Sequence, residues 1–268
     1  MSIRLKREIR RLCTRLDIPL VGFAPADRWD IPLFTPWVPE EFRPGSIFPG
    51  TRTVIVIGIP VSLPAIETSP SIWYQEEYKT VNTLLDAGTH HIASFLNKKG
   101  LASVSIPRDG YGHVSILKER PFAFFSHRHA AFLAGLGNFG VNNVILTRKF
   151  GPRVRFSSVF TTAKIPPDSV IEEPLCTRCM RCVKICPVDA LSAGDYPDAL
   201  TDKLACAARS EDLAARYISP CGFCIKVCPV GGDRALFSRK EIGIYDETKG
   251  EAVKLHDAWS HVRKYGGR

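Results

Sequence analysis

The sequence lacks any uninterrupted apolar run of the roughly 20 residues that would span a membrane. Its N-terminal stretch, MSIRLKREIRRLCTRLDIPLVGF, has basic residues but no long apolar segment after them, so we predict that it is not a secretory signal. Low-complexity segments are also missing. These absences argue against a membrane or secreted protein and favour a cytoplasmic one.

Acidic residues are fewer than basic ones, and the imbalance is uneven along the chain. The net charge is +9. Residues 1–170 carry 21 Lys/Arg and 13 Asp/Glu, residues 171–232 carry seven and eight, and residues 233–268 carry eight and six. The basic first part can attract nucleic acid, a phosphate-bearing cofactor or an acidic redox partner, although a generally basic solvated surface explains the same counts.

Cysteine is present in an informative pattern. The run CTRCMRCVKICPVDA begins at Cys176 with the spacing C-x2-C-x2-C-x3-C-P, and CGFCIKVCPV begins at Cys221 and again ends in Cys-Pro. The first three thiolates of such a run can surround one face of a 4Fe–4S cube, whereas the fourth, before Pro187, typically ligates a neighbouring cluster. Seven such cysteines leave one ligand missing for two cubes, and Cys206 lies between the runs to supply it.

We therefore predict two 4Fe–4S clusters with separate ligand sets. The first set is Cys176, Cys179, Cys182 and Cys228, and the second is Cys186, Cys206, Cys221 and Cys224. Structural zinc sites are the alternative, but zinc ribbons use two separated C-x2-C pairs and fit this spacing poorly. A disulfide framework also fits poorly because the chain is not short and cysteine-dense. Clusters together with the spare thiol Cys13 fit a reducing cytoplasm.

The fold class predicted from the apolar patterns is α/β (α+β), because helices and strands alternate before the cysteines. The continuous β-branched run at 53–60 is typical of a buried central strand. Prolines and acids at 166–168 and 172–174 predict a boundary, which gives domains at 1–170 and 171–232 and a C-terminal wrap at 233–268. Helices are expected at 2–16, 75–99, 128–136 and 201–217, and strands at 20–25, 53–60, 102–107, 143–147 and 153–162.

A second informative segment is HRHAAFLAGLGNFGVNN at 127–143. It resembles the cobalamin-binding core of the epoxyqueuosine reductases and the respiratory reductive dehalogenases, and the following FGPRVR at 150–155 is similar to the dehalogenase version. The family pattern R-x-x-A-x-x-A-G-L-G-x-x-G-x-N is matched by Arg128, Ala131, Ala134, Gly135, Leu136, Gly137, Gly140 and Asn142. Two cubes placed after this core complete the family's order of parts.

The resemblance implies a nitroreductase-like cobalamin-binding domain followed by a ferredoxin-like domain with two 4Fe–4S clusters. The implied cofactor-binding residues are Arg128, Gly135, Leu136, Gly137, Gly140 and Asn142. In that family a corrinoid bound without its lower base becomes a strong reductant once low-potential electrons reach it, and 4Fe–4S clusters can supply such electrons. The glycines lack Cβ atoms, so their backbone can approach a flat ligand, although a glycine-rich turn that binds nothing shows the same pattern.

The sequence departs from the family at the proton donor. The aspartate of the queuosine enzymes corresponds to Pro121, and the nearest acid, Glu119, is two residues out of register. The dehalogenases use a tyrosine backed by a basic or amide side chain, for which Tyr111 is the candidate by position, with a solvent-facing loop tyrosine as the alternative. His127 can also donate a proton near neutral pH, although a structural histidine is the more common case.

These observations predict an oxidoreductase in which a donor such as ferredoxin or flavodoxin passes electrons through two clusters to a bound corrinoid and on to a small organic substrate. An alternative is an electron-transfer protein that reduces the corrinoid of a partner protein, which the missing acid at Pro121 favours. A third is an epoxyqueuosine reductase. Since the queuosine enzymes carry C-terminal repeats that grip tRNA and this sequence ends before such a region, we expect tRNA not to be a substrate.

Overall fold

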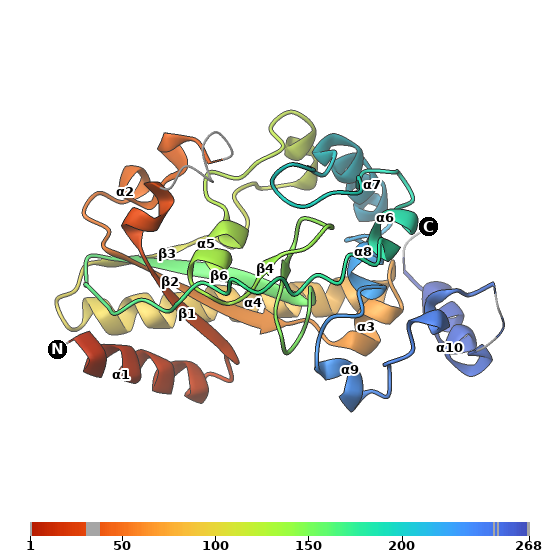
Figure 1. Ribbon diagram of the computed structural model, residues 1–268, viewed down its shortest axis with the longest axis horizontal. Helices are drawn as coiled ribbons and strands as arrows, with labels where there is room; N and C mark the ends of the chain where they lie inside the picture. Colours follow the sequence, from red (N-terminus) through yellow and green to blue (C-terminus); the bar gives the residue numbers. More distant parts are fainter. Residues whose placement is uncertain (1, 31–37, 249, 251, 267–268) are drawn as a thin grey trace.

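The computed structural model describes residues 2–30, 38–248, 250 and 252–266. It has a mixed α/β fold around a four-stranded sheet with the strand order β1-β2-β6-β3 (Figure 1). The strands are β1 (Leu20–Pro25), β2 (Thr53–Pro60), β3 (Ser103–Ile106) and β6 (Val154–Thr161). All three pairings are antiparallel, so the alternation of helices and strands in the sequence produces the α+β variant of the predicted class.

Both faces of the sheet are covered by helices. The helices α1 (Ser2–Arg15) and α4 (Ile72–Asn97) pack on one face, and α5 (His127–Leu133) packs on the other (Figure 1). The central strand β2 serves both cores, because its side chains alternate between the two faces. Ile55 and Ile57 enter the core under α4, whereas Val54 and Val56 enter the core under α5.

The long helix α4 begins three residues before the predicted start at residue 75. The side chain of Ser71 accepts a hydrogen bond from the backbone N–H of Tyr74, which caps the first turn. Gly100, with φ at +75°, follows the helix as expected. The helical spacing of the apolar residues predicts a buried stripe that includes Val81, Leu84 and Leu85, but Leu84 is 50% exposed.

The region between α5 and β6 is a small hairpin instead of the single strand predicted at 143–147. Strand β4 (Asn138–Phe139) pairs with β5 (Ile145–Leu146), and the glycine-rich sequence supplies the entry to β4 and the turn between the strands. The other short elements before the cysteines are α2 (Pro44–Ile47), α3 (Leu63–Glu67) and the 3-10 helices η1 (Ala26–Asp30), η3 (Glu40–Phe42) and η4 (Val114–Lys118).

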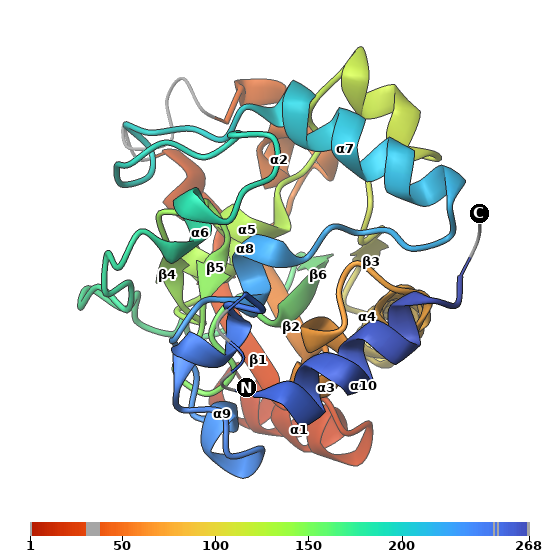
Figure 2. The ribbon, with the colours of Figure 1, turned by 90° about the vertical axis from the view of Figure 1, so that its right-hand side faces the viewer.

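The cysteine-rich region is built from short helices at one end of the sheet. Helix α7 carries Cys206 as predicted, and Asp202 caps its first turn by accepting hydrogen bonds from Leu204 and Ala205. The C-terminal helix α10 lies against α4 (Figure 2). The elements here are α6 (Arg181–Lys184), α7 (Lys203–Ala215), α8 (Phe223–Lys226), α9 (Asp233–Leu236), η5 (Ile242–Tyr245) and α10 (Val253–Arg263).

The segment that joins β6 to the cysteines is fixed to the first helix and the first strand. The Asp168 carboxylate contacts the Lys6 ammonium at 2.7 Å and the Arg10 guanidinium at 2.9 Å. The backbone N–H groups of Asp168 and Phe23 are also engaged, one with the Phe23 carbonyl and the other with the Asp168 carboxylate. The boundary predicted near 166–168 is therefore a tethered connection. No helix among the described residues is long and apolar enough to cross a membrane.

Candidate functional site

The four cysteines predicted to hold the first cluster line a single cavity. It has about 320 Å³ of empty volume, part of which is open to solvent. The walls include Cys176, Cys179, Cys182 and Cys228. Asn142 and Leu146 from the glycine-rich hairpin also line it. The structure thus brings the close-spaced run and the remote Cys228 together.

The other four cysteines form a second, neighbouring group. The pKa of Cys206 is raised by burial and then by the nearby Cys221 and Cys186. Burial also raises the pKa of Cys224, and the nearby Cys221, Cys206 and Cys186 raise it further. Cys182 acts on Cys224 as well, so the two groups adjoin. Cys186, Cys206, Cys221 and Cys224 thus lie near one another, and their assignment to one cluster stays a prediction.

The four cavity cysteines have the spread that a 4Fe–4S cube requires of its ligands. Among the described residues, no three Cys, His, Asp or Glu side chains converge as one metal ion would require. A 4Fe–4S cube binds each thiolate through a different iron, so its ligands surround a volume instead of a point. Burial raises the pKa of Cys228 to about 11, so this thiol keeps its proton until a metal displaces it.

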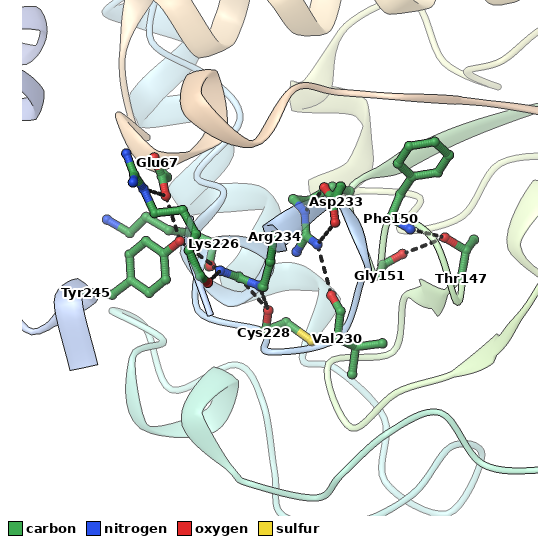
Figure 3. Close-up of polar contacts among 12 residues, drawn as sticks. Glu67, Thr147, Phe150, Gly151, Lys226, Cys228, Val230, Asp233, Arg234 and Tyr245 are labelled. Atoms are coloured by element: carbon green, nitrogen blue, oxygen red, sulfur yellow. Dashed lines mark hydrogen bonds and ion pairs between the residues drawn. The ribbon is translucent and has the colours of Figure 1, made fainter. Parts of the chain in front are cut away.

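Two buried arginines, Arg153 and Arg234, fix the turn that follows Cys228. Figure 3 shows Arg234 beside Cys228. Arg153 donates to the Val230 carbonyl at 2.9 Å, and Arg234 donates to the Cys228 carbonyl at 2.9 and 2.5 Å. The close approach of this turn requires Gly151, since a Cβ atom there would lie 1.9 Å from the Val230 oxygen. One nitrogen of Arg153, Nη1, is buried and has no hydrogen-bond partner among the described residues. The cavity beside this turn is lined by four cysteines, which is the donor set that a 4Fe–4S cluster requires.

The predicted glycines approach the protein's own backbone instead of an open space. A Cβ atom on Gly135 would lie 2.0 Å from the Ser169 oxygen, and one on Gly137 would lie 2.1 Å from the Leu146 oxygen. At Gly140 the nearest atom would be the Asn142 side-chain oxygen, at 2.9 Å. The immediate reason for these glycines is therefore the packing of the hairpin and the tethered segment. This corrects the physical reason that the sequence suggests for them.

The remaining motif residues brace the cysteine region. Arg128 donates to the Asn143 carbonyl at 2.6 Å, and burial lowers its pKa. Asn142 donates to the Cys224 carbonyl at 3.4 Å while it lines the first cavity, so it touches both cysteine groups. Leu136 packs, partly buried, against the core under α5. The family motif therefore lies directly against the two cysteine groups.

We predict that Gly137→Ala destabilises the protein by about 1–3 kcal/mol, the usual range for overpacking. The new methyl group would push on the Leu146 carbonyl, and Leu146 lines the first cavity, so the first cluster should be lost or loosely bound. The thermal midpoint and the iron content report the two effects. Gly45→Ala is the matched control, because a Cβ atom at Gly45 meets nothing within 4 Å. Equal stability and iron content in the two variants would contradict this packing account.

The structure brings Tyr111 into a half-buried polar cluster that the sequence did not indicate. Burial raises the pKa of Tyr111. The neighbouring Tyr78 and Asp109 raise this pKa further, whereas Arg155 lowers it. The Arg155 guanidinium contacts the Asp109 carboxylate at 2.9 Å and lies over the Tyr78 ring at 4.4 Å. Arg155 belongs to the FGPRVR segment, which was the only sequence signal for it. Tyr111 is thus a tyrosine with a basic side chain nearby.

His127 lies at the edge of the same cluster, but both of its ring nitrogens are engaged. Nε2 is 2.8 Å from the Pro107 carbonyl, which can only accept, and Nδ1 is 2.9 Å from the Ser158 hydroxyl. Burial lowers the pKa of His127 to about 4. A neutral ring held at both nitrogens orients the residues around it, which argues against a proton donor at His127.

The helices η4 and α7 contact each other, and large apolar side chains on and near them remain exposed. They are Ile116, Phe122, Phe124, Leu200 and Leu204. The ammonium group of Lys203 lies 5.6 Å from the centre of the Phe122 ring. Exposed apolar groups gathered in this way are typical of a surface that a ligand or partner covers.

Comparison with known proteins finds a 4Fe–4S binding domain and similarity to two kinds of reductase. Residues 169–192 match the model of a 4Fe–4S binding domain. A tetrachloroethene reductive dehalogenase of Desulfitobacterium hafniense is 27% identical over 194 residues, which make up 66% of this chain and 32% of that protein. An epoxyqueuosine reductase of Bacillus anthracis is 34% identical over 111 residues, which make up 39% of this chain and 29% of that protein. The chain thus spans about a third of the length of these relatives.

Solved structures of both kinds share the fold. A catabolic reductive dehalogenase in complex with 3-bromo-4-hydroxybenzoic acid superposes with a TM-score of 0.67, over 97% of this chain and 36% of that one, at 18% identity. An epoxyqueuosine reductase with a modified tRNA stem loop gives a TM-score of 0.59, over 97% and 76%, also at 18% identity. The chain is therefore related to both the reductive dehalogenases and the epoxyqueuosine reductases, and it carries a 4Fe–4S binding domain.

Proposed function

We propose that this chain is a cobalamin-dependent reductase in which two 4Fe–4S clusters deliver electrons, one at a time, to a corrinoid and on to a small organic substrate. The observation that carries the proposal is the contact of the glycine-rich family motif with both cysteine groups, through Asn142. The corrinoid, when bound, would supply the low-potential reductive chemistry. Its domain would be the nitroreductase-like part at 1–170, and the clusters would lie in the ferredoxin-like part at 171–232.

Each group of side chains has a defined part in this proposal. The cavity cysteines hold the first cluster, and the group around Cys206 holds the second. Tyr111 donates the proton that the reduced substrate needs, because its raised pKa keeps the phenol protonated. Arg155 stabilises the phenolate left behind, and Asp109 holds Arg155 in place. His127 orients the segment that carries Tyr111 through its bond with the Pro107 carbonyl.

The electron donor is proposed to be an acidic carrier such as ferredoxin or flavodoxin. Cys179, a ligand of the first cluster, is exposed, and Arg178, Arg181 and Lys184 are exposed near it in the sequence. Basic groups around an exposed cluster would attract an acidic carrier and speed its docking. The first cluster is therefore the proposed point of electron entry.

A second candidate function is reduction of the corrinoid of a partner protein. Pro121 at the family's aspartate position favours it, because a pure electron carrier needs no proton donor. The half-buried Tyr111 cluster favours the first candidate, since it provides another donor. Reduction of epoxyqueuosine in tRNA is the least favoured, because the acid at the Pro121 position is absent.

The deciding experiment is anaerobic purification followed by metal, sulfide and cobalamin analysis. We expect about eight iron and eight sulfide per chain, as two cubes require, and a shift in the spectrum of added cobalamin as its lower base is displaced. Turnover would be sought with tetrachloroethene and 3-bromo-4-hydroxybenzoic acid, which are named for relatives. Zinc in place of iron would overturn the whole proposal. If the protein contains iron but binds no cobalamin in equilibrium dialysis, the result would favour the second candidate function, reduction of a partner protein's corrinoid.

A further inference from the structure

We propose that Arg234 raises the reduction potential of the first cluster and so makes the point of electron entry easier to reduce. The inference rests on the proposed function, because it assumes a cluster held by Cys228 and the three cysteines of the close-spaced run. Its basis is a buried guanidinium whose bonds all go to uncharged oxygen atoms beside that ligand. It assigns a function to the C-terminal segment, which the sequence shows only as a wrap.

Arg234 is 3% exposed and reaches Cys228 directly. Its Nε and Nη2 atoms donate to the Cys228 carbonyl, and Nη2 also donates to the Lys226 carbonyl at 2.7 Å. Its Nη1 atom donates to the Tyr245 hydroxyl oxygen at 2.8 Å and to the Arg239 carbonyl at 3.4 Å (Figure 3). None of these partners carries a negative charge, so the positive charge of Arg234 remains next to the ligand.

The neighbouring arginine, Arg153, shows the opposite arrangement. It is equally buried and donates to the Val230 carbonyl of the same turn, but Nε and Nη2 also bind both oxygens of Asp233, at 2.9 and 2.6 Å. Arg153 and Asp233 therefore form a neutral pair that holds the turn. Arg234 holds the other side of the turn and adds a charge.

The acid that Arg234 reaches through the Tyr245 hydroxyl is already neutralised. Glu67, from α3, is 1% exposed and accepts a hydrogen bond from the Tyr245 hydroxyl at 2.8 Å. The same carboxylate oxygen binds the Arg239 guanidinium at 2.9 Å. Arg234, Arg239 and Glu67 together leave one net positive charge in a buried network. This network joins helix α3, through Glu67, to the C-terminal segment beside Cys228.

Electrostatics gives the sign of the effect. A cluster becomes more negative by one charge when it accepts an electron, and a nearby positive charge stabilises the reduced form more than the oxidised form. Because Arg234 is buried, water screens its charge less than that of a surface arginine. The charge therefore raises the potential of the adjacent first cluster and has less effect on the more distant second cluster.

The test compares charge-changing variants of the full chain, reconstituted with iron and sulfide, in redox titrations followed by EPR. Arg234→Gln should lower the equilibrium constant for reduction of the first cluster at least tenfold, which corresponds to 59 mV for a one-electron couple. Arg234→Lys keeps the charge and should stay within threefold of the wild type. Arg148→Gln removes an exposed arginine and should leave both potentials unchanged. The wave that persists in a Cys206→Ala background belongs to the first cluster.

Glu67→Gln separates the charge effect from a structural one. It removes a negative charge while its side-chain oxygen can still accept from Tyr245 and Arg239, so the potential should rise instead of fall. Shifts of opposite sign in the two variants support the proposal. Equal potentials in all variants, or shifts of the same sign, would overturn it. If Arg234→Gln fails to bind iron, the rise in Glu67→Gln decides alone. Absence of iron in the wild type would instead refute the proposed function.

Discussion

Replacing Tyr111 with Phe should lower the rate of substrate reduction by about 10²–10⁴-fold, the range that a general acid contributes. Burial, Tyr78 and Asp109 raise the pKa of the phenol, so it is protonated and uncharged at neutral pH. Arg155 then compensates the negative charge that forms on the oxygen as the proton leaves. Phe keeps the ring and removes only the donor, so iron content and cobalamin binding should be unchanged.

The measurement is single-turnover release of halide from whichever test compound the wild type reduces, together with iron and cobalamin content. Tyr217→Phe is the matched control, because Tyr217 is exposed and far along the chain from this cluster. Its rate should equal that of the wild type. A Tyr111→Phe enzyme with the wild-type rate would show that the proton comes from water or another side chain. In that case Tyr111 would be a packing residue of the loop.

Replacing Cys206 with Ala should remove the second cluster and leave the first, so that iron falls from about eight to about four per chain. Cys206 lies on the first turn of α7, and Ala is a good helix former, so the helix itself should persist. The first cavity is lined by other cysteines and does not include Cys206. Iron and sulfide analysis with EPR would count the clusters that remain.

Cys13→Ala provides the control for this loss. Cys13 is buried in the core under α1 and α4, and burial raises its pKa to about 12, so it stays a neutral thiol away from the cysteine groups. Its removal should cost about 1 kcal/mol of stability and no iron. Equal loss of both clusters in the Cys206→Ala variant would show that the assignment of ligands is wrong, or that the second cluster is needed for the region to fold.

The regular elements of the fold followed from local patterns in the sequence. The continuous apolar run of β2 predicted a central strand because such a run can be satisfied only when both faces are covered, and the structure places it between two helical layers. The meeting of Cys228 with the close-spaced run in one cavity was predictable for a similar reason, since cluster ligands follow fixed spacings. Leu84 was misassigned because helical periodicity alone does not say where the stripe ends.

The polar clusters could not be predicted, because their members come from distant parts of the chain. Arg155 and Asp109 are 46 positions apart and meet only because β6 passes beside the segment that carries Tyr111. Glu67 and Tyr245 are separated by 178 positions. The glycines illustrate a different limit. The sequence indicates that the backbone approaches something closely at Gly137, but only the structure shows that the neighbour is Leu146.

The tethered segment at Asp168 also determines how this protein can be dissected. Its backbone pairs with Phe23, and its carboxylate holds Lys6 and Arg10, so cutting the chain there would remove contacts from α1 and β1 together. A fragment that begins after residue 170 would lose these anchors, because Asp168 and its partners Lys6, Arg10 and Phe23 all stay with the first part of the chain. We therefore expect that limited proteolysis will spare this connection, and that the cysteine-rich part will not be transferable to another protein as a cassette.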